Sequence, residues 1–252
     1  MATYKKRGAK KSATNAGQTE QKIESTTAEV FETLDTSASK TEAFVAKYQN
    51  IILVGIGVIT LGVLGYLAYD TYVSTPKTNE AISELNQAQY YFNLAVNGEY
   101  SDGLFEQSIE GGAGKYGFKD IIENYSNTEA SNLATYSTGM AYFNIKDYQQ
   151  AIDYLSDFSS DDVLLSSLAM GVTGDAYAQL GDNAKALSFY KKAFGENEND
   201  YTTPKYLFKA ALISDLLEKK GEALKYFQRI QKEFPTSLQA SQIEIQIGRL
   251  EN

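Results

Sequence analysis

The longest apolar stretch of the chain runs from Tyr48 to Tyr69 and contains 22 residues without a charge, between Lys47 and Asp70. As an α-helix it would be roughly 33 Å long, enough to cross a bilayer core of about 30 Å. Tyrosines near both ends suit the boundary between lipid and water. A buried core helix of this length normally shows a polar face, and a cleavable signal peptide normally starts nearer the first residue. The pattern therefore predicts a membrane anchor helix over residues 39–73.

Three glycines of this stretch, Gly55, Gly62 and Gly65, lie on one side of the predicted helix. Glycine lets two membrane helices approach closely, although it is also common in membrane helices without such a contact. We therefore treat the three as candidates for packing against another membrane helix.

The residues before the anchor form a predicted tail over residues 1–38. Its first part is polar and rich in small side chains, which predicts partial disorder. Thr26 and Ser39 each stand three residues before a glutamate, a spacing typical of a helix start. The later part of the tail is thus either a helical spacer or a docking segment for a partner.

After the anchor, one pattern of small and large residues occurs three times. A small residue is followed twelve positions later by an alanine and then, four positions on, by a large apolar residue. The copies begin at Gly139, Gly174 and Ala211, which are 35 and 37 residues apart. The pattern resembles the tetratricopeptide repeat, a helix-turn-helix unit of 34 residues in which small residues let two helices pack closely. One hairpin cannot bury its apolar face alone, so successive copies are expected to stack as a solenoid.

Two further segments extend this solenoid. Residues 118–131 resemble residues 227–241, so they predict the second half of an earlier hairpin. Its first half would be a helix over residues 76–96 with Thr75 as its N-cap, and a glycine-rich insertion over 97–114 would separate the two halves. Residues 237–250 predict a terminal capping helix.

The predicted fold is all-α. A single transmembrane helix is followed, over residues 75–252, by a tetratricopeptide-repeat solenoid of about four helical hairpins with a C-terminal capping helix.

Composition restricts the chemistry that this fold can perform. The chain has no histidine and no cysteine, which removes the best proton-transfer side chain near neutral pH and excludes disulfides and thiolate metal sites. The formal net charge of −9 has the wrong sign for nucleic acid. We therefore expect no enzyme activity, no cofactor, no metal and no nucleic-acid partner.

Three short segments resemble binding motifs but lack essential residues. Residues 110–116, EGGAGKY, contain a Gly-Lys pair, yet Ile109 and Tyr116 stand where a phosphate loop has Gly and Ser or Thr. The acidic segments 159–163 and 196–200 lack the alternation of a calcium loop. We interpret the first as a helix N-cap and the second as a solvated turn.

The concave face of such a solenoid, lined by the first helix of each hairpin, is where this class of repeat binds peptides. Counting from the motif's small residues gives the candidates for a protein-binding groove. They are Leu133, Tyr136, Met140, Phe143, Asn144, Leu168, Asp175, Ala178, Gln179, Lys205, Phe208, Leu212 and Asp215. This mixture suits an extended or helical protein segment, although some of these residues could instead pack against the capping helix. It has too few Lys, Arg and Asn for the two-carboxylate clamp of heat-shock co-chaperones.

The distribution of basic residues predicts the orientation in the membrane. Residues 1–49 contain eight Lys and Arg, whereas Lys77 is the only basic residue between the apolar stretch and Lys115. Positive charge favours the cytoplasmic side, so we expect a cytoplasmic N-terminus and a solenoid outside the cytoplasm.

This layout resembles the ancillary subunit of the bacterial Sec translocon, a single-pass periplasmic tetratricopeptide protein. The tail sequence STTAEVFETLDTSASKTEAFVAKYQ and the repeat sequence IIENYSNTEASNLA resemble those of versions of this subunit from Bacteroidota. The resemblance implies an inner-membrane protein that works beside the SecYEG channel with exported chains and a periplasmic prolyl isomerase chaperone. The alternative is an envelope scaffold for cell-division or outer-membrane assembly proteins.

Overall fold

The computed structural model describes residues 26–98, 103–196 and 198–251, so the predicted disordered part of the tail lies outside the described residues. The chain divides into two compact units, residues 1–66 and residues 67–252. Regular secondary structure in the described residues is helical throughout, and an isolated bridge joins Gly112 to Lys115. The predicted all-α fold is confirmed.

Helix α1 runs from Thr26 to Tyr69 and carries the apolar stretch. The large apolar side chains of this stretch are exposed, which is unfavourable in water and fits a lipid surrounding. In the described part of the chain, one helix is long and apolar enough to cross a membrane, and it contains this stretch. Helix α1 passes through Ser39 without a break, so the predicted helix start at Ser39 is wrong.

Helical backbone continues beyond α1 through one wide turn, the π-helix Asp70–Ser74, into α2, Thr75–Asn97. Thr75 has helical backbone angles (φ −61°, ψ −48°), and the predicted N-cap at this residue is therefore wrong. Pro76 would normally end a helix, because its ring meets the carbonyl four residues earlier. That carbonyl belongs to Tyr72, inside the wide turn, where the usual helical spacing is relaxed.

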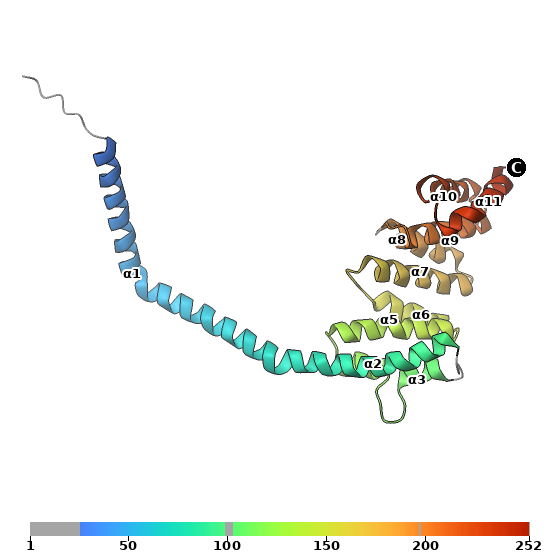
Figure 1. Cartoon of the computed structure of the whole chain (residues 1–252), viewed down its shortest axis with the longest axis horizontal. Coiled ribbons are helices and arrows are strands. Elements are labelled where there is room, and N and C mark those ends of the chain that lie inside the picture. Colours follow the sequence, from blue (N-terminus) through green and yellow to red (C-terminus); the bar gives the residue numbers. More distant parts are fainter. Residues whose placement is uncertain (1–25, 99–102, 197, 252) are drawn as a thin grey trace, which may run out of the picture. The chain divides into compact units, whose positions relative to one another are not determined.

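The second unit contains the three predicted copies as paired helices (Figure 1). Helix α5, Glu129–Asn144, packs on α6, Tyr148–Asp157, and α7, Val163–Gln179, packs on α8, Asn183–Gly195. The third pair is α9, Thr202–Leu216, with α10, Lys220–Glu233. Each pair also contacts the next through α6 and α7 or through α8 and α9, as expected of a solenoid.

The turns inside these pairs repeat one backbone arrangement. In the first two turns a residue with left-handed backbone, Lys146 (φ 68°) or Gly181 (φ 82°), precedes an aspartate. The carboxylates of these aspartates, Asp147 and Asp182, accept backbone N–H bonds from the first turn of the next helix. The third turn has Glu218 (φ 60°) in the left-handed position but no capping side chain.

The small residues of the motif lie where the two helices of a pair touch. A Cβ atom added at Gly139 would lie 2.6 Å from Cγ of Leu155, and one added at Gly174 would lie 2.7 Å from a ring carbon of Tyr190. Ala211, in the third copy, is fully buried. These contacts explain why the pattern pairs a small residue with a large one.

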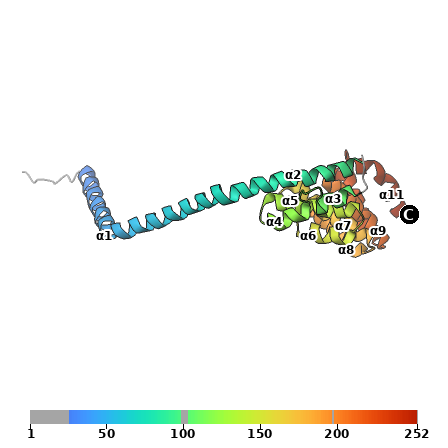
Figure 2. The ribbon, with the colours of Figure 1, turned by 90° about the horizontal axis from the view of Figure 1, so that it is seen from below.

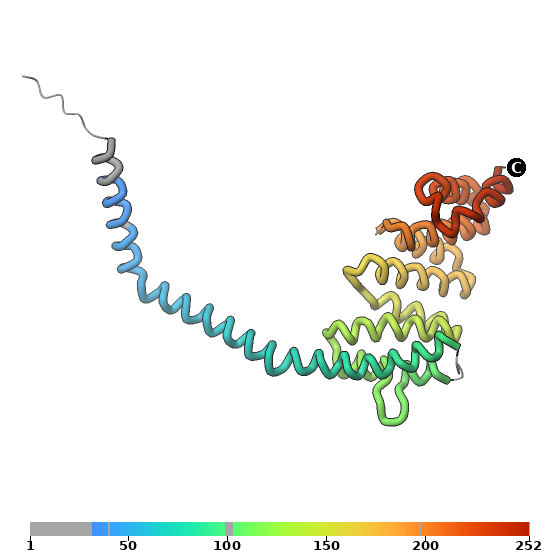
Figure 3. The backbone as a smooth tube through the Cα atoms, viewed as in Figure 1, coloured from blue at the N-terminus to red at the C-terminus, as the bar shows by residue number. Residues whose placement is uncertain are grey.

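The first hairpin contains a helix that the sequence pattern does not indicate. Helix α3, Leu104–Glu110, forms inside the predicted insertion, and its Ile109 is 1% exposed. The backbone then leaves as a narrow hairpin and returns to start α4, Phe118–Asn124 (Figure 3). Ala113 (φ 53°) and Gly114 (φ 75°) form the two-residue turn at its tip. Helices α3 and α4 both contact α2, so together they provide the second half of this hairpin.

The other end of the repeats is closed by the predicted capping segment. It forms the 3-10 helix η2, Leu238–Gln242, and then α11, Ile243–Glu251. Ile243 is buried, and Ile247 and Leu250 pack against the core of the third pair. Figure 1 shows α2 and α11 at opposite ends of the row of repeat helices, and Figure 2 looks along this row, so that the repeat helices overlap.

Candidate protein-binding surface

The predicted groove residues fall into groups with different contacts. The apolar group is half-buried and packs against the cores between helices: Leu133, Tyr136, Met140, Phe143, Leu168, Ala178 and Phe208. Leu212 is exposed, as are Asn144 and Gln179. The side chain of Asn144 donates to the backbone oxygen of Met140 (2.8 Å). The three charged candidates have separate environments.

Asp175 is held by the neighbouring repeat. Its carboxylate accepts two bonds of 2.6 Å from Nζ of Lys209 and one of 2.7 Å from the hydroxyl of Tyr190. Burial, together with the charge of Asp175, raises the pKa of Tyr190, so this hydroxyl stays protonated and donates. Asp175 therefore ties α7 to α8 and α9.

Asp215 is held by the capping helix, since its carboxylate pairs with the guanidinium of Arg249 in α11. The side chain of Asp215 is 19% exposed. This contact matches the alternative that some predicted groove residues pack against the cap.

Lys205 and Phe208 line a surface hollow of about 500 Å³ between the start of α9 and the residues that follow α10. Tyr201 and Leu238 line it as well, and they are 68% and 84% exposed. We call this the Lys205 hollow. It combines a cationic side chain with accessible aromatic and aliphatic surface, which is the composition of a site for a protein segment.

A second hollow, of about 450 Å³, lies between α5 and the start of α7, and we call it the Leu133 hollow. Leu133 stands six residues before Gly139, as Lys205 stands six residues before Ala211. The two hollows thus occupy corresponding places in two repeats. The charged residues of the Leu133 hollow are carboxylates: Glu129, Asp161 and Asp162.

The ammonium group of Lys205 is in an unfavourable electrostatic position. Burial and then the charge of Lys209 lower the pKa of Lys205, and the charge of Asp175 only partly offsets them. Its Nζ lies 5.4 Å from the ring centroid of Tyr206. Among the residues that the structure describes, no carboxylate forms an ion pair with Lys205.

The sequence pattern did not indicate Tyr201 and Leu238 as site residues. Both lie just outside the repeat helices, Tyr201 immediately before α9 and Leu238 at the start of η2. A large apolar residue in a connection that is otherwise polar is the signal that would have drawn attention to them.

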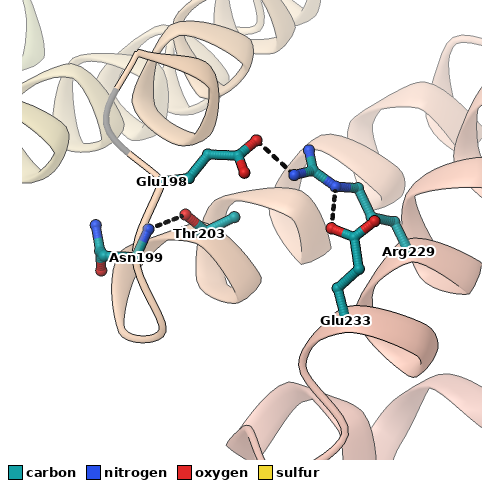
Figure 4. Close-up of polar contacts among 5 residues, drawn as sticks. All are labelled: Glu198, Asn199, Thr203, Arg229 and Glu233. Atoms are coloured by element: carbon teal, nitrogen blue, oxygen red, sulfur yellow. Dashed lines mark hydrogen bonds and ion pairs between the residues drawn. The ribbon is translucent and has the colours of Figure 1, made fainter.

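Glu196, Glu198 and Asp200 in the acidic segment before α9 are exposed, as predicted for a solvated turn, and some residues of the segment also make side-chain contacts. Figure 4 shows Arg229 of α10 between Glu198 of this segment and Glu233 of its own helix. The side-chain oxygen of Asn199 accepts from the backbone N–H of Thr202 (2.8 Å), the first residue of α9. The segment therefore connects α9 with α10.

The other two motif-like segments have structural roles. Asp162 accepts backbone N–H bonds from Leu164 and Leu165, so the predicted N-cap is confirmed. Residues 110–116 mostly form the hairpin between α3 and α4, closed by two backbone bonds between Gly112 and Lys115. Within the described ranges, no group of three or more acidic side chains is arranged to hold a metal ion.

The glycines of the apolar helix have open surroundings. No described side chain lies within 4 Å of a Cβ atom added at Gly55, Gly62 or Gly65. The described part of the chain thus leaves this side of the helix uncovered.

Comparison with protein families identifies the repeats. Models of the tetratricopeptide repeat match residues 134–161, 171–200 and 205–237. These segments lie in the pairs α5–α6, α7–α8 and α9–α10, so the three copies are tetratricopeptide repeats. A comparison with curated proteins gives no match. Repeats of this kind serve in general as non-catalytic modules that bind other proteins.

Proposed function

We propose that this chain is a membrane-anchored protein-interaction module. In this proposal residues 39–73 anchor it, residues 1–38 are the tail, and residues 75–252 bind segments of other proteins. The Lys205 hollow carries the proposal, because it places two predicted groove residues beside the exposed side chains of Tyr201 and Leu238. Exposed apolar side chains around a hollow mark interaction sites.

In this proposal the repeat domain lies in the periplasm and the tail lies in the cytoplasm. The excess of Lys and Arg before the apolar stretch supports this orientation. The acidic balance of the rest of the chain disfavours contact with anionic lipid, which keeps the repeats available for protein partners.

The partners in this proposal are the SecYEG channel, a periplasmic prolyl isomerase-type chaperone and exported protein chains. The layout of tail, anchor and repeats supports it, through its resemblance to the ancillary translocon subunit. The open glycine surface of the apolar helix also supports it, since Gly55, Gly62 and Gly65 allow close approach of a channel helix. The competing function is that of an envelope scaffold for division or outer-membrane assembly proteins, and the Lys205 hollow would serve it equally.

Photo-crosslinking in live bacterial cells distinguishes these functions. A photoreactive amino acid replaces Gly62 in the apolar helix or Leu238 in the Lys205 hollow. Lys225, an exposed residue of α10 outside both hollows, is the control position. The translocon role predicts channel subunits at Gly62 and a chaperone or exported chains at Leu238, both absent at Lys225. Division or outer-membrane assembly proteins at both positions, without channel subunits, would favour the scaffold.

A further inference from the structure

The two hollows occupy corresponding places but differ in charge. The Leu133 hollow is lined by three carboxylates and has no basic residue, whereas the Lys205 hollow has two lysines and one carboxylate, Asp200. The repeat fold alone explains a hollow at each place. It does not explain the difference in charge, which must come from the individual residues.

Only one of the two lysines in the Lys205 hollow has a charge to offer a ligand. Lys209 is neutralised by Asp175, which it contacts through both carboxylate oxygens. Lys205 has no such partner among the described residues, and Lys209 and Asp175 are the charged groups that shift its pKa. Among the described residues, Asp200 forms no ion pair with Lys205.

Part of the hollow around Lys205 is apolar or aromatic, formed by Phe208, Tyr201 and Leu238. Phe208 packs edge-on against Phe227, which fixes its ring at 5.7 Å between centroids. Leu238 and Tyr201 present exposed surface on the same hollow. A partly buried cation beside apolar surface gains most from a ligand that brings one anion and covers the apolar groups at the same time.

We infer that the Lys205 hollow binds a short protein segment with one internal Asp or Glu next to an apolar side chain, the carboxylate on Lys205 and the apolar group on Phe208 and Leu238. This inference rests on the proposed function and names the chemistry of its partner. A chain end with both a terminal and a side-chain carboxylate fits less well, because the hollow offers one uncompensated cation. The Leu133 hollow, with its carboxylates, repels the same segment.

The test uses the full chain in detergent and three short peptides with blocked ends. The peptides are identical except for a central Glu, Gln or Lys between Leu and Phe, and fluorescence anisotropy measures their binding. We expect the Glu peptide to bind about tenfold more tightly than the Gln peptide, the gain of one charge-assisted hydrogen bond. The Lys peptide should bind most weakly.

Variants then assign the preference to the hollow. Lys205→Gln should abolish the preference for Glu over Gln, while the matched control Lys225→Gln, which removes the same charge from an exposed site, should leave it intact. Leu238→Ser should weaken the binding of all three peptides. Because the side chain of Leu238 is exposed, this substitution should leave the fold intact. Thermal unfolding checks that Lys205→Gln is folded.

The outcomes separate this inference from the proposed function. Peptide binding without a preference for Glu, or a preference that survives Lys205→Gln, overturns the inference and leaves the interaction module standing. If none of the three peptides binds, the inference is overturned, and the crosslinks formed at Leu238 decide the proposed function.

Discussion

Glycines have opposite surroundings in the apolar helix and in the repeats. In the repeats, a Cβ atom added at Gly139, Gly171 or Gly174 would lie less than 3 Å from a side chain of the facing helix. In α1, no described side chain lies within 4 Å of a Cβ added at Gly55 or Gly62. The first set is thus required by contacts within the chain, whereas the second set has no such contact among the described residues, and we propose that it packs against another molecule.

This difference predicts how substitutions should act. A larger side chain in the repeats should destabilise the fold, whereas one in the apolar helix should leave the fold intact and change only its associations. Substitutions at single glycines test each half of the comparison.

Gly171→Leu should have the largest effect on stability. A Cβ atom at this position would lie 1.8 Å from Cζ of Tyr206, whose ring is fully buried, so the ring must leave its place. We expect a loss of about 3 kcal/mol or more, the upper end for overpacked cores. Thermal unfolding followed by circular dichroism measures it. In a Tyr206→Ala background the same substitution should cost much less, and an equal cost in both backgrounds would contradict the account.

Gly174→Leu should come next, with a loss of about 1–3 kcal/mol. The added side chain meets the ring of Tyr190 and, at 3.3 Å, the backbone oxygen of Ala186. Because neighbouring repeats stabilise one another, hydrogen exchange should accelerate in α9 as well as in α7 and α8. An unchanged melting curve would mean that Gly174 is not at a helix contact.

Gly117→Ala should have a smaller, local effect. A Cβ atom at Gly117 would lie 2.2 Å from the backbone nitrogen of Gly111, where the hairpin between α3 and α4 closes. We expect faster hydrogen exchange in α3 and α4 and little change in α9. Gly221→Ala, in α10, is the control, since nothing lies within 4 Å of an added Cβ there and its backbone is not left-handed. Equal exchange in both variants would show that the close approach at the base is unimportant.

Gly62→Leu should have the smallest effect on stability, within about 0.5 kcal/mol, as for other surface substitutions. It should nevertheless reduce co-purification of a membrane partner, because the helices can no longer approach closely. Loss of stability without loss of the partner would show that Gly62, like the repeat glycines, is required by contacts within the chain.

The sequence was sufficient to predict the features that repeat or that depend on one short segment. The spacing from Gly139 to Gly174 and Ala211 predicted the helix pairs, since each small residue faces a large one at a fixed distance along the chain. The uncharged stretch predicted an apolar helix because its signal lies within one continuous segment of the chain. Asp162 could be predicted as an N-cap because capping involves only neighbouring residues.

Features that depend on residues far apart in the chain could not be predicted from the sequence. The hollow around Lys205 requires Leu238, and the state of Asp175 requires Lys209 from the next repeat. Helix α3 was missed because residues 104–110 lie in a glycine-rich context, although Ile109 gains its burial against other helices. The break predicted before Pro76 was wrong because the wide turn at Asp70–Ser74 tolerates the proline.

In the proposed function, the apolar stretch spans a membrane and separates the tail from the repeats. The chain has no cysteine, so a single cysteine at Ser12 or at the exposed Ser188 can be labelled without background. In intact spheroplasts, a membrane-impermeant maleimide should label the cysteine at Ser188 and reach the one at Ser12 only after lysis. Labelling at Ser12 alone in intact spheroplasts would show that the orientation is opposite to the one proposed. Labelling at both positions would show that the stretch does not cross the membrane.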